Sequence, residues 1–188
     1  MKGCFLFVGL MISLASFSQG KFLPEVKTGT TMQYLANVNG QEIPVGFKVD
    51  SLAAEFLKIV WSVEGYGEGT WIMKKNSLQS ATGTLAENPE PGVEVVLPDD
   101  KIQLLFSKDQ FAMITKDKKV KHNNVDYTVA AASATNEFKL ADKAVDVIYL
   151  ESADKSSKIW ALNNAAFPLL VKVLGNANGP DLTLLSLK

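Results

Sequence analysis

The sequence predicts an all-β protein: a single antiparallel curved sheet, a half-barrel or a barrel, with little helix. Apolar residues recur with a period of two in several stretches, as in Leu57, Ile59, Trp61 and Val63. Residues at i and i+2 share one face of a strand, so this period indicates strands rather than helices. Turn-forming residues separate the stretches at roughly 8 to 14 residues, a spacing typical of antiparallel sandwiches and barrels.

Taken in chain order, the alternation and the intervening turns predict strands at 30–37, 42–51, 55–63, 69–76, 80–86, 92–97, 101–107, 110–115, 119–131, 144–152, 157–163, 166–174 and 181–187. Asn39-Gly40 is the strongest turn signal, because both residues tolerate the positive φ that a tight hairpin requires. Helix is expected only at 51–57, where Ser51 can cap a turn, and at 130–140, which is rich in alanine.

Three late segments, 159–162, 167–174 and 182–187, are apolar on both faces. A strand with one face in water shows a cleaner alternation of apolar and polar residues. We therefore expect the second face of these strands to be covered by another part of a closed barrel, by a second sheet or by a ligand.

Residues 1–19 are typical of an export signal. Lys2 provides the positive start, an apolar run extends from Cys4 to Ala15, and Ser16-Phe17-Ser18 offers small residues to a signal peptidase. The alternative, a membrane anchor, needs about 20 apolar residues, and this run is shorter. We expect an exported protein, periplasmic or extracellular, in which 20–188 form a single β domain with no stable membrane span after cleavage.

The amino-acid composition bears on the chemistry and on the partners to be expected. Cys4 is the only cysteine, so the cleaved chain would have no disulfide and no thiolate chemistry. All nineteen basic residues are lysines and the formal net charge is −1. The lysines of 116–121 have no aromatic neighbour on which a base would stack. We therefore expect no nucleic-acid partner.

The stretch VEGYGEGTWIM, residues 63–73, contains Gly65, Gly67 and Gly69. A phosphate-binding loop requires a helix after its glycines, whereas the residues after Gly69 favour a strand. We interpret the stretch as a hairpin with loop 64–68, which would place Trp61 directly opposite Trp71.

No residue pattern predicts catalysis, a metal site or a cofactor. His122 is the only histidine; as a general base it would need an orienting carboxylate and a nucleophile, and a surface turn is the simpler interpretation. Asp99-Asp100 with Glu94 suggests calcium, but calcium requires six to eight oxygens in a shaped loop, so a plain turn is favoured.

The tryptophans are the candidate ligand-binding residues. Trp61, Trp71 and Trp160 would line a cleft for a sugar or a lipid, or would belong to the core, as buried aromatic residues usually do.

Three segments carry a family resemblance. FLPEVKTGTTMQYLANVNGQEIP (22–44), SLQSATG (77–83) and the ending FPLLVKVLGNANGPDLTLLSLK (167–188) resemble uncharacterised exported β domains of Bacteroidota, the TapB-like group. These domains are distantly similar to lipoprotein-sorting carriers, which hold acyl chains on the concave side of a curved sheet. The resemblance implies a curved antiparallel sheet and assigns no catalytic residue.

These observations predict an exported, non-enzymatic binding module that holds an apolar or amphipathic ligand, such as a lipid, on a concave sheet. The alternative is an envelope protein-interaction or structural module that uses a sheet edge or a loop face. An apolar cavity would favour the first function, and a long unpaired edge strand the second. An enzyme is the third hypothesis and would require convergent carboxylates or a Ser-His pair.

Overall fold

The computed structural model describes residues 21–86, 89–176 and 178–188; the expected export signal, 1–19, lies outside the described residues. The strands are β1 (Thr31–Val38), β2 (Gln41–Leu52), β3 (Phe56–Val63), β4 (Gly67–Lys74), β5 (Glu94–Val96), β6 (Lys119–His122), β7 (Val125–Val129), β8 (Lys139–Leu140), β9 (Lys143–Ala144), β10 (Val147–Ser152), β11 (Lys158–Leu162), β12 (Leu170–Leu174) and β13 (Asp181–Leu187). The helices within these residues are α1 (Lys75–Ser80) and α2 (Lys108–Asp117).

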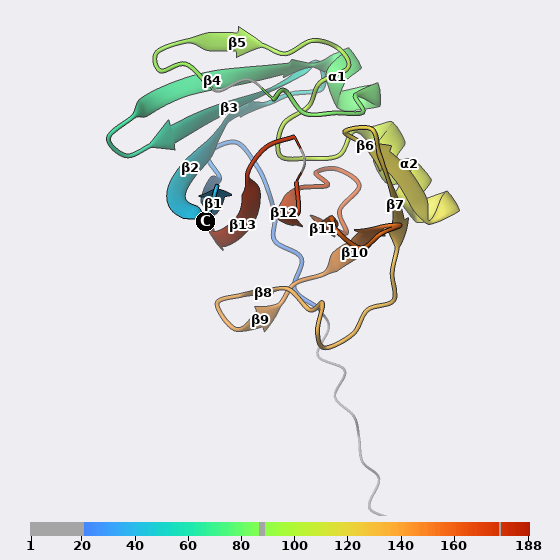
Figure 1. Cartoon of the computed structure of the whole chain (residues 1–188). Coiled ribbons are helices and arrows are strands. Elements are labelled where there is room, and N and C mark those ends of the chain that lie inside the picture. The colour runs from blue at the N-terminus through green and yellow to red at the C-terminus, as the bar shows by residue number, and fades with distance from the viewer. Residues whose placement is uncertain (1–20, 87–88, 177) are drawn as a thin grey trace, which may run out of the picture.

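The described residues form an eleven-stranded sheet in the order β5-β4-β3-β2-β1-β13-β12-β11-β10-β7-β6 and a separate two-stranded sheet, β8-β9 (Figure 1). Neighbouring strands are antiparallel except β4 and β5, which are parallel. The prediction of an all-β protein with a single antiparallel sheet is confirmed only in its coarser form, since the fold is mostly β and mostly antiparallel but has a parallel pair and a second small sheet. The barrel alternative is wrong because the sheet stays open. One end is the short β5, and at the other end the Gln110 side chain of α2 donates to Lys121 O of β6 at 2.8 Å.

Two predicted hairpins have the expected turn residues. Asn39 and Gly40 join β1 to β2 with φ of 54° and 84°. The β3–β4 hairpin is also present, but its predicted register is wrong by two residues: Trp61 faces Gly69 rather than Trp71. The loop is shorter than the predicted 64–68: pairing continues to Val63 and Gly67, so the loop is 64–66.

Helix α2 replaces the strand predicted at 110–115. Ser107 accepts a hydrogen bond from Gln110 N, and the Gln110 side chain accepts one from Ser107 N, which together form a capping box. This reciprocal pair satisfies backbone donors that a helix start leaves free, and it outweighs the β-favouring residues that follow.

Five other predicted elements are also wrong. The single strand predicted at 119–131 is a hairpin of β6 and β7 that turns at Asn123 and Asn124. The segments 80–86 and 101–107 make only isolated bridges, Gly83 to Lys101 and Leu105 to Leu169. The helix predicted at 51–57 is the tight connection between β2 and β3, with Ala53 N donating to Phe56 O. The helix predicted at 130–140 is a loop, because polar side chains bond the backbone there in place of helical hydrogen bonds.

The sheet curves so that its two halves share a main core on the inner side (Figure 1). Residues of this core come from both halves and from the 97–105 segment, and include Met32, Tyr34, Phe47, Ile59, Trp61, Leu97, Ile102, Tyr149, Trp160, Leu162 and Leu169. A second core lies beneath α2 and contains Phe106, Ile114, Val120, Tyr127, Leu150, Ile159, Ala161, Leu170 and Val173.

The second core explains why β10, β11 and β12 are apolar on both faces. The expected cover over the second face of 182–187 is wrong, since Leu185 of β13 is 53% exposed. Tyr149 and Trp160 enter the main core, whereas their chain neighbours Leu150 and Ile159 enter the second core. The covering element is therefore a helix, which was not among the three alternatives that the sequence suggested. Among the described residues, no helix has the length and apolar character needed to cross a membrane.

Candidate functional site

The structure brings two of the three candidate tryptophans together. The rings of Trp61 and Trp71 lie 6.4 Å apart, diagonal across the β3–β4 pair, and Trp71 stacks on Phe47 at 5.8 Å. Trp61 is only 2% exposed. Trp160 lies on β11, beyond β2, β1, β13 and β12 from this pair, and is 5% exposed. None of the three lines either of the two clefts described below.

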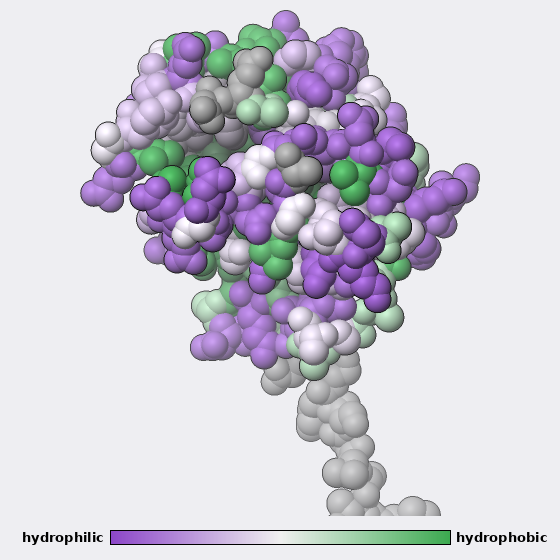
Figure 2. Space-filling view, in the orientation of Figure 1, coloured by the Kyte–Doolittle hydropathy of each residue, from purple (hydrophilic) through white to green (hydrophobic). Residues whose placement is uncertain are grey.

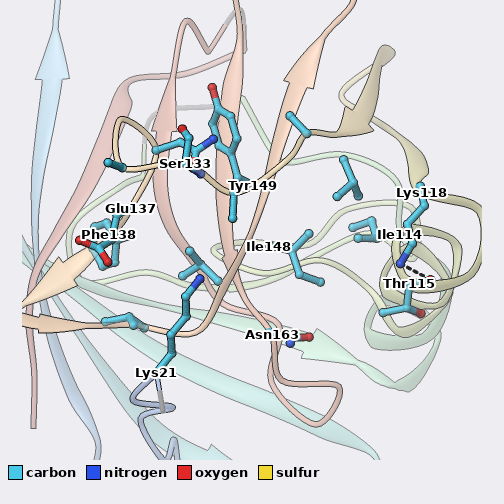
Figure 3. A pocket seen from close by; sticks show the side chains of 17 residues that line it. Lys21, Ile114, Thr115, Lys118, Ser133, Glu137, Phe138, Ile148, Tyr149 and Asn163 are labelled. Carbon is cyan, nitrogen blue, oxygen red and sulfur yellow. Dashed lines mark hydrogen bonds between the residues drawn. The ribbon is translucent and has the colours of Figure 1, made fainter. Parts of the chain in front are cut away.

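A cleft of about 620 Å³ opens beside β10, between this strand, the end of α2 and the 130–138 segment (Figure 3). We call it the β10 cleft. Its apolar wall consists of Ile114, Val129, Phe138, Val145, Val147 and Ile148. Ala130, Ala132 and Ala134 also line it, and the polar lining consists of Thr115, Ser133, Asn136, Glu137, Tyr149, Asn163 and the two lysines Lys21 and Lys118.

The β10 cleft exists because β7 is shorter than the strand it pairs with. Their register ends at Leu150 opposite Val129, and one more hydrogen bond joins Ala130 N to Tyr149 O at 3.0 Å. Val147 and Ile148 of β10 extend past that point, so the space beside them is not filled by a strand neighbour.

Asn136 holds the outer wall of the β10 cleft in place. Its side chain donates to Ala131 O at 2.9 Å and accepts from Ser133 N at 2.7 Å, which closes the loop on itself. Trp160 Nε1 donates to Asn136 O at 2.7 Å. Trp160 therefore anchors the cleft wall from inside the core and does not face the cleft.

The charged groups of the β10 cleft leave positive charge at its mouth. Glu137 already pairs with Lys139 at 3.1 Å. Lys118 Nζ donates to Thr115 O at 2.9 Å, as the dashed line in Figure 3 shows, and Lys21 extends from the opposite side. An ammonium bonded to a single carbonyl keeps donors for an anion.

Tyr149 lines the β10 cleft and also belongs to the main core. Burial, and then the hydrogen bond that its hydroxyl donates to Glu151, raise the pKa of Tyr149 far above its ordinary value. The lining of the cleft contains no histidine and no cysteine.

A second cleft, of about 600 Å³, lies beside the β8–β9 turn, and we call it the β9 cleft. Its apolar lining is Phe22, Pro24, Leu140 and Leu187, and its charged lining is Glu25, Lys27, Lys143 and Lys188. Lys143 Nζ lies 5.7 Å from the centre of the Phe22 ring.

His122 is a core residue, so its interpretation as a surface turn residue is wrong. It is 3% exposed, packs edge-on against Phe106 at 5.2 Å, and its Nδ1 lies 3.1 Å from Gln110 Nε2. Because Gln110 Nε2 can only donate, Nδ1 accepts and the ring proton is assigned to Nε2. Burial lowers the pKa of His122 to about 4.

The three acidic residues considered for calcium have separate partners. Asp99 accepts from Asn76 at 2.9 Å, Asp100 pairs with Lys101 at 3.5 Å, and Glu94 pairs with Lys58 at 2.7 Å. Across residues 21–86, 89–176 and 178–188, no group of three or more His, Cys, Asp and Glu side chains is arranged to hold a metal ion.

No protein-family model matches the chain, and neither a curated protein nor a solved structure matches it. The resemblance to the exported β domains therefore depends on the sequence segments alone, and the function must be argued from the geometry of the clefts.

Proposed function

We propose that the protein is an exported, non-enzymatic binding module that holds an amphipathic anion in the β10 cleft. The observation that carries the proposal is the combination of one apolar wall with two lysines at the mouth of the same cleft. The inner side of the curved sheet is filled by the main core, so the proposed ligand lies at the end of β7 and not on the concave surface.

The size and chemistry of the β10 cleft fit such a ligand. Small-molecule sites usually enclose about 300–1,000 Å³ and combine apolar walls with a few polar groups that fix orientation. A chain placed against Val147, Ile148 and Phe138 would gain about 25 cal/mol for each Å² of apolar surface it buries. Each exposed lysine would add roughly 0.2–1 kcal/mol by pairing with a carboxylate or a phosphate.

Saturable binding of a fluorescent fatty acid, displaced by unlabelled laurate, tests this proposal. Ala132→Trp should weaken binding at least tenfold, because Ala132 lines the cleft and an indole would fill it. Ala131→Trp is the matched control: Ala131 is the preceding residue, is also exposed, and does not line the cleft. Equal binding by both variants, or no saturable binding by the wild type, would contradict the proposal.

The anionic part of the proposal has its own test. Lys118→Gln should weaken laurate binding by about two- to fivefold, the equivalent of one exposed ion pair. Lys119→Gln, which changes an exposed lysine outside the cleft, should have no effect. A fatty alcohol of the same length should bind more weakly than laurate, and equal affinity would remove the role of the lysines.

The alternative function, gripping an envelope protein through a sheet edge, has less support. The exposed edge strand β5 spans only three residues, and Pro91 and Pro98 flank it, which limits pairing with another strand. On the face shown in Figure 2, hydrophobic residues appear as small separate groups among hydrophilic ones.

Export is tested separately by peptide mapping: secreted protein should begin between Ser18 and Lys21.

A further inference from the structure

The two clefts lie on either side of one short segment. Lys21 lines the β10 cleft, and the next residue, Phe22, lines the β9 cleft. Phe22 N donates to Ala144 O and Asp146 N donates to Phe22 O, both at 2.8 Å, so this segment pairs with the chain between β9 and β10. Figure 1 shows the start of the described chain at the lower end of the molecule, beside the β8–β9 hairpin.

The 138–145 region also borders both clefts. Phe138 and Val145 belong to the wall of the β10 cleft, and Leu140 and Lys143 to that of the β9 cleft. A molecule lying across Lys21 and Phe22 would therefore reach an apolar wall on each side without any rearrangement of the sheet.

Positive charge accumulates along the same boundary. Glu25 pairs with Lys27 at 3.5 Å and Glu137 with Lys139 at 3.1 Å, so both carboxylates among the cleft linings have a lysine partner. Lys21 and Lys143 remain on either side of the segment, one in each cleft. An anion placed between the clefts would meet an ammonium from each.

Resting on the proposed function, we propose that the two clefts form one composite site for a lipid with two acyl chains and an anionic head group. One chain lies in each cleft, and the head group lies over Lys21 and Phe22, between the amines of Lys21 and Lys143.

Joining two chains in one molecule makes the second binding event intramolecular. The affinity of the two-chain lipid then exceeds that of a one-chain lipid by a factor set by the effective concentration of the second chain. This factor reaches about 10²–10⁴ when the distance between the two chains matches the distance between the two clefts. Dioctanoylphosphatidylglycerol, used below its critical micelle concentration, should therefore bind at least a hundredfold more tightly than the one-chain octanoyl lysophosphatidylglycerol. Dioctanoylphosphatidylcholine, whose head group has no net charge, should bind more weakly than its anionic counterpart.

A matched pair of variants on adjacent residues separates the two clefts. Phe22→Gln removes the aromatic wall of the β9 cleft and should weaken dioctanoylphosphatidylglycerol binding about tenfold, with laurate binding in the β10 cleft unchanged. Leu23→Gln is the control, because Leu23 is as exposed as Phe22 (43% against 44%) and lines neither cleft. Isothermal titration calorimetry gives affinity and stoichiometry together.

The outcomes distinguish this inference from the proposed function. Absence of laurate binding to the wild type would overturn the proposed function and the inference with it. Laurate binding with no advantage of the two-chain lipid over the one-chain lipid would overturn only the composite site. Two molecules of the two-chain lipid bound per protein, or equal loss in Phe22→Gln and Leu23→Gln, would also overturn it.

Discussion

Replacing Gly69 with alanine tests how the β3–β4 hairpin packs. A Cβ at this position would lie 2.7 Å from Trp61 Cζ2 and 2.9 Å from both Cε2 and Nε1. Carbon atoms in ordinary contact are about 3.5–4.0 Å apart, so the indole must shift. Trp61 is 2% exposed and already contacts Trp71 and Tyr66, at ring distances of 6.4 and 6.2 Å. Overpacking of this kind costs about 1–3 kcal/mol.

Urea unfolding followed by far-ultraviolet circular dichroism measures this cost. Gly69→Ala should lower the unfolding midpoint with an unchanged m-value, since the surface exposed on unfolding stays the same. In a Trp61→Leu background, Gly69→Ala should cost about 0.5 kcal/mol or less, because the indole that the methyl group meets is gone. A coupling energy of about 1 kcal/mol or more is therefore expected from the double-mutant cycle. An equal cost in both backgrounds would refute the steric argument.

Three further substitutions or conditions test other parts of the fold. Gly175→Ala should cost roughly 4 kcal/mol or more, because φ is 64° and the added Cβ would collide with Ser156 O; soluble yield and urea midpoint measure it. Ser107→Ala should cost about 1 kcal/mol in thermal unfolding by removing the cap of α2 that Gln110 completes. The pKa of His122 is lower in the folded state, about 4, than the ordinary 6.5, so its contribution to stability is complete above pH 6.5 and falls as the pH approaches 4. The loss totals roughly 3 kcal/mol, and His122→Gln should flatten the stability profile between pH 7 and 5; an unchanged profile would contradict the assignment.

The first four strands were predictable because their signals are local. Alternation over 55–63 and the Asn39-Gly40 turn act within a few residues, and the structure places both as expected. The register of β3 with β4 was not predictable to the residue. A three-residue loop and a five-residue loop both keep the same residues of each strand on the same face, so the apolar alternation cannot distinguish between them.

The strands predicted at 101–107 and at 110–115 are wrong for two different reasons. Ile102, Leu104 and Phe106 are buried, but only isolated bridges pair their segment with other chain segments. The backbone bends at Leu104, whose φ is 65°, and Leu104, Leu105 and Phe106 are all buried. A period of two among apolar residues therefore does not by itself show a strand with a paired neighbour. For α2, the Ser107 and Gln110 spacing of a capping box was present in the sequence and would have identified the helix start.

Neither cleft could be predicted from the sequence, because each depends on where distant segments stop. The β10 cleft requires β7 to end at Val129 while β10 continues, and its wall requires the contact between Trp160 and Asn136. Trp160 was named for its residue type, and its actual contact with the site is indirect. The signal that would have helped is the polar run around Ser133 and Asn136, which interrupts an alanine-rich stretch and favours a loop over a helix.

The apolar second face of the late strands supported a ligand at first, and the structure changes the basis of that argument. A strand buried on both faces shows only that something covers it, and here α2 covers β10 and β11. The case for a ligand then depends on surface that the protein leaves uncovered. That surface is found where β10 extends past its partner, and it combines apolar side chains with lysines. An uncharged apolar ligand would contact the apolar side chains and leave the lysines without a partner. An amphipathic anion would contact both, which is why it is the more specific hypothesis.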